Sequence, residues 1–278
     1  MKRYPSVPHA EDSPALFDGG HLWVQELLDG AHLRFRMEPS GALRFGDRER
    51  VFRDGGVPLA YDHAVRHVRE SLDRAALRAA VDDVGSVVFF AEAMHRQAVA
   101  YDWHRTPSVL GVDVWDEDSG RFLPPDAVEQ IFERLGLEPV NTFEKEVRAA
   151  DFQPESATFP QSAWREGPAA GLFLRNKTGG RARLPNPAVE LDADPEPLTG
   201  EAEVLAARYA DDERLRRVAE TVDSREGAVT FESLFDRAFE SILRETHARL
   251  DHGQTTLDVG EFRSAVAARC RAWLAEQE

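Results

Sequence analysis

An Asp-Gly dipeptide, Asp29-Gly30, separates two runs rich in apolar and aromatic residues, Leu22–Leu28 and His32–Met37. Asp-Gly is a strong tight-turn signal, because both residues tolerate the positive φ that two-residue turns require. The pattern therefore predicts two β-strands joined by a tight turn. The runs Ala42–Phe45 and Arg50–Phe52 predict another pair of strands, so this part of the chain is expected to form antiparallel sheet.

Longer segments that follow alternate between helical and extended patterns. Apolar residues recur at helical spacing from Tyr61 to Asp83, where His63 and His67 lie one turn apart. The two histidines are either half of a metal site or, as we expect, solvent-facing residues of a charged helix. Pro125–Leu135 begins with proline and predicts a helix that ends at Gly136.

Two apolar, β-branched runs, Ser86–Ala91 and Val109–Trp115, predict central strands. Leu172–Arg175 and Arg181–Leu184 flank Thr178-Gly179-Gly180 and predict a hairpin. Residues 150–170 show no clear period, so we expect a surface connection there.

A stretch rich in Pro and Asp, from Pro185 to Pro197, breaks these patterns and is the expected domain boundary. After it, residues 200–222, 229–250 and 257–276 have the apolar spacing of amphipathic helices. We therefore expect an α+β fold, with a domain of antiparallel sheets and packed helices over residues 1–190 and a helical domain over residues 198–278.

The charge balance is unusual, with 50 acidic residues against 34 basic ones and a formal net charge of −16. The lysines are Lys2, Lys145 and Lys177. An acidic, lysine-poor surface keeps a protein dispersed in concentrated salt, which favours a halophilic and archaeal cytoplasm. A GC-rich genome would also favour arginine over lysine but would not explain the acidic excess. The same excess disfavours broad, nonspecific binding to nucleic acid, so any RNA contact is expected from a local arginine cluster.

Other classes of protein are disfavoured by what the sequence lacks. It contains no apolar run of 18 residues and no hydrophobic segment near Met1, so we expect no membrane span and no signal peptide. The single cysteine, Cys270, excludes an intramolecular disulfide and a cysteine-based zinc site. Its helical surroundings predict a packed or partly exposed thiol.

Five blocks in a fixed order carry a family resemblance. They are Val24–Phe35 with Glu26-Leu27-Leu28-Asp29-Gly30, then Leu43–Arg50, Phe90-Ala91-Glu92 leading to Val99–Asp102, Val109–Asp116, and Gly171–Asn176 with Arg181-Ala182-Arg183. In this order and spacing the chain resembles the ATP-dependent RNA ligases, which are covalent nucleotidyltransferases, over roughly residues 1–190. In that family a Lys-x-Asp-Gly segment carries the lysine that attacks the α-phosphate of ATP.

This chain departs from the family pattern at several positions. Leu27 stands where the resemblance places the nucleophilic lysine, and an aliphatic side chain cannot form a phosphoramidate. Ala170 stands where a metal-binding glutamate is expected, unless the block is aligned instead onto Glu166-Gly167. Arg181 and Arg183 replace the usual lysines and keep the positive charge. Val112 precedes Asp113 where the family often places an aromatic residue that stacks on adenine.

The resemblance implies a set of site residues and cofactors. ATP and Mg²⁺ or Mn²⁺ are the implied cofactors, with Glu92 and Asp113 as candidate metal ligands, and RNA ends or nucleotides are the implied partners. The implied nucleotide- and phosphate-binding residues are Glu26, Asp29, Gly30, Arg34, Arg44, Arg48, Glu92, Asp113, Arg175, Arg181 and Arg183.

The altered positions favour a protein that binds nucleotide or RNA ends with lost or impaired covalent adenylylation, a pseudoenzyme of the ligase family. The alternative is an active, divergent RNA ligase that joins 5′-phosphate and 3′-hydroxyl ends, for which Lys177 is the candidate substitute nucleophile. A third possibility, an acidic interaction module without a ligand, explains neither the ordered blocks nor Glu92. Relatives in the resembled family suggest a homodimer through the C-terminal helices.

Overall fold

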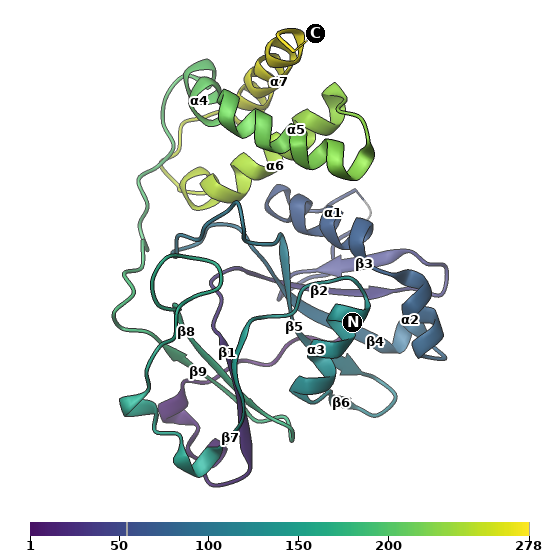
Figure 1. The fold of residues 1–278 in the computed structure, drawn as a ribbon, viewed down its shortest axis with the longest axis vertical. Helices are drawn as coiled ribbons and strands as arrows, with labels where there is room; N and C mark the ends of the chain where they lie inside the picture. Colours follow the sequence, from purple (N-terminus) through teal and green to yellow (C-terminus); the bar gives the residue numbers. More distant parts are fainter. Residues whose placement is uncertain (54, 278) are drawn as a thin grey trace. The chain divides into compact units, whose positions relative to one another are not determined.

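The computed structural model describes residues 1–53 and 55–277. By its internal contacts the chain divides into unit 1, Met1–Leu191, and unit 2, Asp192–Glu278. Unit 1 contains two antiparallel sheets with helices packed against them (Figure 1). The α+β class expected from the sequence is confirmed.

The first sheet has the strand order β7-β1-β8-β9. Its strands are β1 (His21–Glu26), β7 (Thr142–Arg148), β8 (Gly171–Asn176) and β9 (Arg181–Pro185). The second sheet has the order β3-β2-β4-β5-β6. Its strands are β2 (Ala31–Met37), β3 (Leu43–Gly46), β4 (Val87–Ala93), β5 (Val109–Asp116) and β6 (Arg121–Phe122).

Strands β1 and β2 belong to different sheets, so the predicted hairpin around Asp29-Gly30 is wrong. β1 pairs with β7 and β8, whereas β2 pairs with β3 and β4. Residues 27–30 instead carry the chain from one sheet to the other. Local turn chemistry could not reveal this, because the partners of both strands lie far away in the sequence. The hairpin predicted around residues 178–180 does form, between β8 and β9.

Side-chain alternation gives each sheet two different faces. On β2, Leu33, Phe35 and Met37 enter the main core under the helices α1 (Asp62–Ser71), α2 (Arg74–Ala80) and α3 (Pro125–Arg134). The intervening residues of β2 face away from these helices, as period-two geometry requires. On the first sheet, Leu22, Val24, Leu172, Leu174 and Ala182 pack under the short 3-10 segments η1 (Ala10–Asp12), η2 (Pro14–Leu16) and η5 (Ala149–Asp151). A further 3-10 segment, η6 (Pro154–Ser156), follows η5 in the chain.

Some elements differ from the sequence expectation. Arg50–Phe52 forms only an isolated bridge to Gly46. The predicted helix over Tyr61–Asp83 consists of η3 (Leu59–Tyr61), α1 and α2, because Asp73 accepts the amide of Ala76 and starts a new helix. His63 was expected to face solvent, but it is buried and its Nε2 lies 3.3 Å from Nδ1 of His95. It contacts a residue 32 positions away, which helical spacing could not show.

Unit 2 is helical, with α4 (Ala202–Tyr209), α5 (Asp212–Glu226), α6 (Phe231–Leu250) and α7 (Val259–Ala275) around one apolar core. Asp211 caps α5 by accepting the amide of Arg214, which separates α4 from α5 within the expected first helix. Cys270 is buried in this core, and burial raises the pKa of its thiol to about 11. Within the described residues, none of the helices combines the length and apolarity needed to cross a membrane.

Candidate functional site

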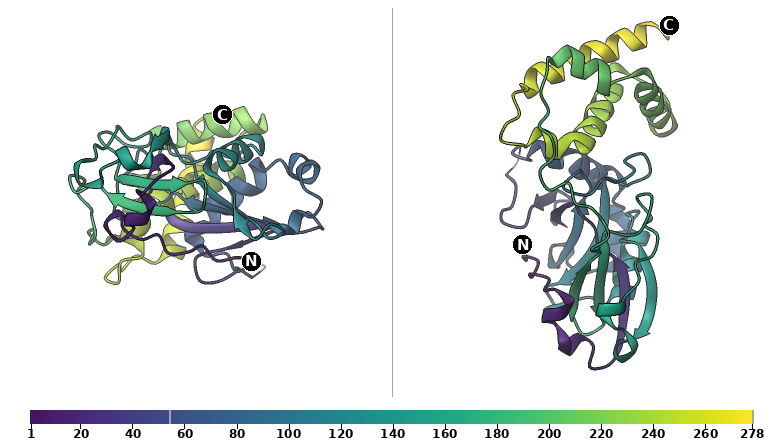
Figure 2. Two further views of the ribbon diagram at one scale, coloured as in Figure 1. Left: turned by 90° about the horizontal axis from the view of Figure 1, so that it is seen from below. Right: turned by 90° about the vertical axis from the view of Figure 1, so that its left-hand side faces the viewer.

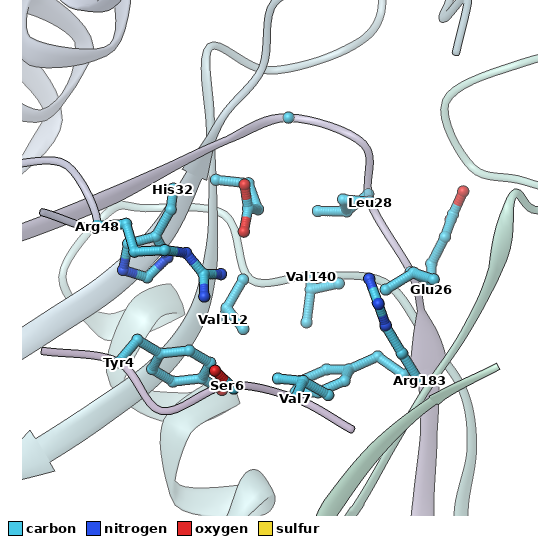
Figure 3. Close-up of a pocket in the computed structure, with 14 residues that line it drawn as sticks. Tyr4, Ser6, Val7, Glu26, Leu28, His32, Arg48, Val112, Val140 and Arg183 are labelled. Atoms are coloured by element: carbon cyan, nitrogen blue, oxygen red, sulfur yellow. The ribbon is translucent and has the colours of Figure 1, made fainter. Parts of the chain in front are cut away.

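A pocket of about 450 Å³ lies in unit 1 where the two sheets approach each other. Its walls come from β1, β8 and β9 of one sheet, from β2, β4 and β5 of the other, and from the N-terminal segment (Figure 3). The lining residues are Tyr4, Ser6, Val7, Glu26, Leu27, Leu28, Gly30, His32, Arg48, Glu92, Val112, Val140, Phe173 and Arg183. The volume and the mixture of apolar walls with a few charged groups are typical of a small-molecule site.

The segment that crosses between the sheets, residues 27–30, forms one side of this pocket. A Cβ at Gly30 would lie 2.9 Å from the carbonyl oxygen of Ala93, so only glycine fits against β4. Asp29 does not line the pocket. Its carboxylate accepts the amides of Ala98 and Val99 at 2.8 and 2.6 Å, and its own amide donates to the Tyr101 hydroxyl. Asp29 therefore holds the loop after β4.

Leu27 lies where β1 meets β8, and its side chain lines the pocket. Its amide donates to the carbonyl of Gly171 at 3.0 Å, and a Cβ at Gly171 would lie 2.7 Å from Leu27 Cδ2. Ala170, next to Gly171, packs in the apolar cluster that contains Leu28 and Trp164. Glu166 is exposed in the turn before β8 and is not among the lining residues. The structure thus places Leu27 beside the Ala170-Gly171 segment, and both Leu27 and Ala170 are apolar.

The charged groups of the pocket include Glu92 and Arg48, and neither side chain has a hydrogen-bond or ion-pair partner among the described residues. Burial raises the pKa of Glu92 to about 8, opposed by Arg48 and reinforced by Asp29. His32 lies opposite Glu92 in the β2–β4 ladder. Burial, together with Arg48 and Arg34, lowers the pKa of His32 to about 4, and its Nε2 has no hydrogen-bond partner among the described residues.

Glu26 is buried at the end of β1, with its carboxylate satisfied within the protein. It accepts hydrogen bonds from Asn141 Nδ2 at 3.0 Å, from the Ser162 hydroxyl and from the amide of Ala163 at 3.2 Å. Ser162 belongs to the segment that the sequence predicted only as a surface connection. Its hydroxyl helps to satisfy the buried carboxylate of Glu26.

The three arginines of the β8–β9 hairpin have different surroundings. Arg175 and Arg181 donate to the buried carboxylate of Asp113 at 2.6 and 2.9 Å, and Tyr4 donates to it at 3.0 Å. We call these four residues the Asp113 clamp. It joins the two sheets, and none of its three charged residues lines the pocket. Arg183 does line the pocket, and its side chain is exposed.

Other residues named from the sequence lie outside the pocket. Arg34 is buried and donates to the carbonyls of Met1 and Lys2. Arg44 is exposed and pairs with Glu38. Lys177 pairs with Glu146 and Asp126 at the far end of β8. These side chains have partners within the fold.

Lys177 is also remote from Leu27. Gly171, which bonds to Leu27, lies six residues earlier on the same hairpin, and a strand rises by about 3.3 Å per residue, so the backbone separation is roughly 20 Å. Its contacts with Glu146 and Asp126 raise the pKa of Lys177, which disfavours the neutral amine that a nucleophile needs.

A divalent metal held by protein side chains does not fit this donor set. Of the candidate ligands, Asp113 is bound to Arg175 and Arg181, and only Glu92 faces the pocket. The second carboxylate in the lining, Glu26, is occupied by its three donors. Over residues 1–53 and 55–277 the structure contains no group of three metal-binding side chains.

Several lining residues were missed from the sequence. Phe173 and His32 could have been found from strand alternation, since they share a face with Arg175 and Arg34 respectively. The contributions of Tyr4, Ser6 and Val7 carried no signal, because residues 1–9 have neither strand nor helix periodicity.

Comparison with solved structures shows the fold. Three structures of Naegleria gruberi RNA ligase resemble this chain at 12% identity: the enzyme with PPi, at a TM-score of 0.52, and two mutants with ATP and Mn, at 0.52 and 0.53. Each similarity covers 68% of this chain and 56–57% of the ligase, so this chain spans little more than half the length of those proteins. No curated protein matches the sequence.

The sequence itself matches a protein-family model, that of RNA ligase, over residues 20–182. This region contains β1 to β8 and most of the pocket lining, and it exceeds half of the 278 residues. The chain therefore belongs to the RNA ligase family.

Proposed function

We propose that unit 1 binds a nucleotide or the 5′-phosphorylated end of an RNA reversibly in this pocket, without forming a covalent adenylate. The observation that carries the proposal is the combination of Leu27 with Arg48 and Arg183 in one pocket. Leucine cannot attack a phosphate, whereas guanidinium groups form charge-assisted hydrogen bonds with it.

The shape of the pocket supports a nucleotide as ligand. Leu28, Val112, Val140 and Phe173 supply apolar surface for a base, and the arginines supply charge for a phosphate. In Figure 3, Arg48 and Arg183 reach into the pocket from opposite sides, so a phosphate between them would contact both sheets. Because Glu92 is largely protonated at neutral pH, it would donate a hydrogen bond to an anion instead of repelling it.

An active RNA ligase with a substitute nucleophile is the second candidate, favoured by family membership. Lys177 would have to fill that role, but its Nζ pairs with two carboxylates roughly 20 Å along the sheet from Leu27. Lys2 lies over the ring of Trp115, and Lys145 pairs with Glu129. These positions favour binding over catalysis.

The acidic composition also supports a halophilic, archaeal host for this protein. The net charge of −16 is distributed over a chain with three lysines. Concentrated salt shortens the range over which surface carboxylates repel one another.

The test is incubation of the full chain with α-labelled ATP and Mn²⁺ in molar KCl, followed by two parallel readouts. We expect label to co-elute with the native protein on a rapid gel-filtration column and to be absent from the protein after denaturing electrophoresis. Label that survives denaturation in the wild type and disappears in Lys177→Ala would establish the ligase alternative. Absence of label in both readouts would contradict the binding proposal.

A further inference from the structure

The segment from Met1 to His9, here called the N-terminal strap, contacts both sheets of unit 1. It is extended and precedes the first 3-10 turn, η1 (Figure 2). Family membership does not account for it, since the matched region starts at residue 20. Among the contacts that fasten the strap, three sets connect it to Arg34, to Asp113 and to Arg183.

The first set is made by Arg34 on β2. Its Nη1 donates to the carbonyl oxygens of Met1 at 3.1 Å and Lys2 at 2.8 Å, and the residue is 2% exposed. A buried guanidinium is unfavourable unless it is hydrogen-bonded, and the carbonyls of Met1 and Lys2 in the strap accept hydrogen bonds from Arg34. Arg34 and the strap therefore stabilise each other.

The second set is the Asp113 clamp. Tyr4 is buried and donates to Asp113, and its ring packs against Phe90 and His32 with centroid distances of 5.0 and 5.5 Å. Arg181 lies over the same ring, 5.1 Å from its centroid. Tyr4 thus fixes the strap where the two sheets are joined.

The third set involves Arg183 on β9. Its amide donates to the carbonyl of Pro8 at 2.9 Å, and its Nη2 lies 2.9 Å from Nε2 of His9. Between the second and third sets, Ser6 and Val7 form a wall of the pocket (Figure 3). The strap therefore supplies part of the wall and also orients Arg183, an arginine of the pocket.

We propose that Arg34 and Tyr4 are positioning residues for the ligand site: they hold the N-terminal strap, and the strap holds the Ser6-Val7 wall and Arg183 in their binding positions. This inference rests on the proposed function. By thermodynamic linkage, a ligand that contacts the strap must stabilise the attached strap to the same extent that the attachment strengthens its binding.

The test compares the wild-type chain with two substitutions at Arg34 and a matched control. Arg34→Met removes the guanidinium group, and with it both hydrogen bonds to the strap, but keeps an unbranched side chain. Arg34→Lys restores a cationic hydrogen-bond donor. Arg44→Met changes an exposed arginine on the neighbouring strand that bonds to Glu38. AMP affinity is measured by titration calorimetry, and amide hydrogen exchange is followed over residues 1–9 and at the Arg183 amide, with and without saturating AMP.

We expect Arg34→Met to weaken AMP binding at least fivefold and to speed exchange in the strap, with saturating AMP restoring part of the protection. Arg34→Lys should recover most of the affinity, and Arg44→Met should match the wild type. Tyr4→Phe, which removes only a hydroxyl, should give a smaller loss in the same direction and serves if Arg34→Met fails to fold.

Two results would overturn the inference while leaving the proposed function intact. One is faster strap exchange with unchanged AMP affinity, and the other is AMP binding by the wild type that leaves exchange in the strap unaltered. Absence of AMP binding by the wild type would overturn the proposed function and this inference together.

Discussion

Two groups of ionisable residues lie between the sheets of unit 1, and they differ in whether other side chains of the protein bind them. In the Asp113 clamp, the carboxylate of Asp113 accepts hydrogen bonds from Arg175, Arg181 and Tyr4, and the charged side chains are almost fully buried. In the pocket, Glu92 and Arg48 have no hydrogen-bond or ion-pair partner among the described residues. The same residue types on the same two sheets can thus either hold the fold together or remain available to a ligand.

The largest expected effect comes from breaking the clamp. Asp113→Asn removes the charge that faces two buried guanidinium groups, and leaving buried charges unpaired typically destabilises a protein by about 3–5 kcal/mol. Glu92→Gln is the matched control, because Glu92 is mostly neutral at pH 7 and its side chain has no bond to lose. Urea denaturation should show a large fall in the free energy of unfolding for the first variant only; equal losses would erase the distinction between the clamp and the pocket.

The next effect concerns the arginines of the pocket. Arg48→Ala and Arg183→Ala should each weaken AMP binding by roughly 1.5–3 kcal/mol, or about 10- to 150-fold, since each removes a charge-assisted contact. Arg44→Ala is the control on the same sheet, with Glu38 as its partner, and should leave the affinity unchanged. Calorimetry in fixed high salt measures all three. A loss in Arg44→Ala equal to the others would indicate binding to the general arginine surface.

A smaller effect on AMP affinity is expected from pH. The folded protein holds a proton on Glu92 up to about pH 8, whereas a glutamate in the unfolded chain loses it near its ordinary pKa of 4.5. The stability contributed by this proton is complete below about pH 4.5 and is lost as pH rises to about 8. An ionised Glu92 would also repel a bound phosphate by about 1 kcal/mol, so AMP affinity should fall about fivefold between pH 7 and 9.

Glu92→Gln cannot ionise, so its unfolding free energy and its AMP affinity should lack this component of the pH dependence. A wild-type protein whose affinity rises above pH 8, relative to the Gln variant, would show that the ionised carboxylate assists binding, as it would in holding a cation.

The smallest effect concerns the charge of the exposed surface, outside both the Asp113 clamp and the pocket. With a net charge of −16, lowering KCl from molar to millimolar should lower the melting temperature by about 2–4 °C, because repulsion between exposed carboxylates is less screened. The salt dependence should be the same in Glu92→Gln, since that side chain is partly enclosed. A melting temperature that stays flat or rises would contradict the halophilic interpretation.

Short-range sequence patterns predicted much of the fold, but they could not distinguish the residues of the Asp113 clamp from those of the pocket. The β8–β9 hairpin, the two central strands and the placement of Arg175, Arg181 and Arg183 on one face follow from alternation. Whether an arginine faces Asp113 or an open pocket depends on the other sheet. Asp113 lies more than 60 residues from Arg175 and Arg181 in the sequence, so local patterns carry no information about this contact. The placement of β1 and β2 in different sheets was missed for the same reason.

The strap and β7 show a second limit. Residues 1–9 are held by hydrogen bonds with Arg34, Asp113 and Arg183, which are scattered along the sequence, and such contacts leave no periodic pattern. β7 contains Glu144-Lys145-Glu146 and pairs with β1 through shifted registers, which obscured its alternation. The candidate site could therefore be located from the ligase-like blocks, but part of its wall could not.

Reversible, noncovalent binding of a nucleotide in the pocket is tested most directly by a crystal structure of the chain with AMP. We predict AMP in the pocket, with its phosphate between Arg48 and Arg183 and with no covalent link to any side chain. AMP bound elsewhere, at the Asp113 clamp or attached to Lys177, would exclude noncovalent binding between Arg48 and Arg183.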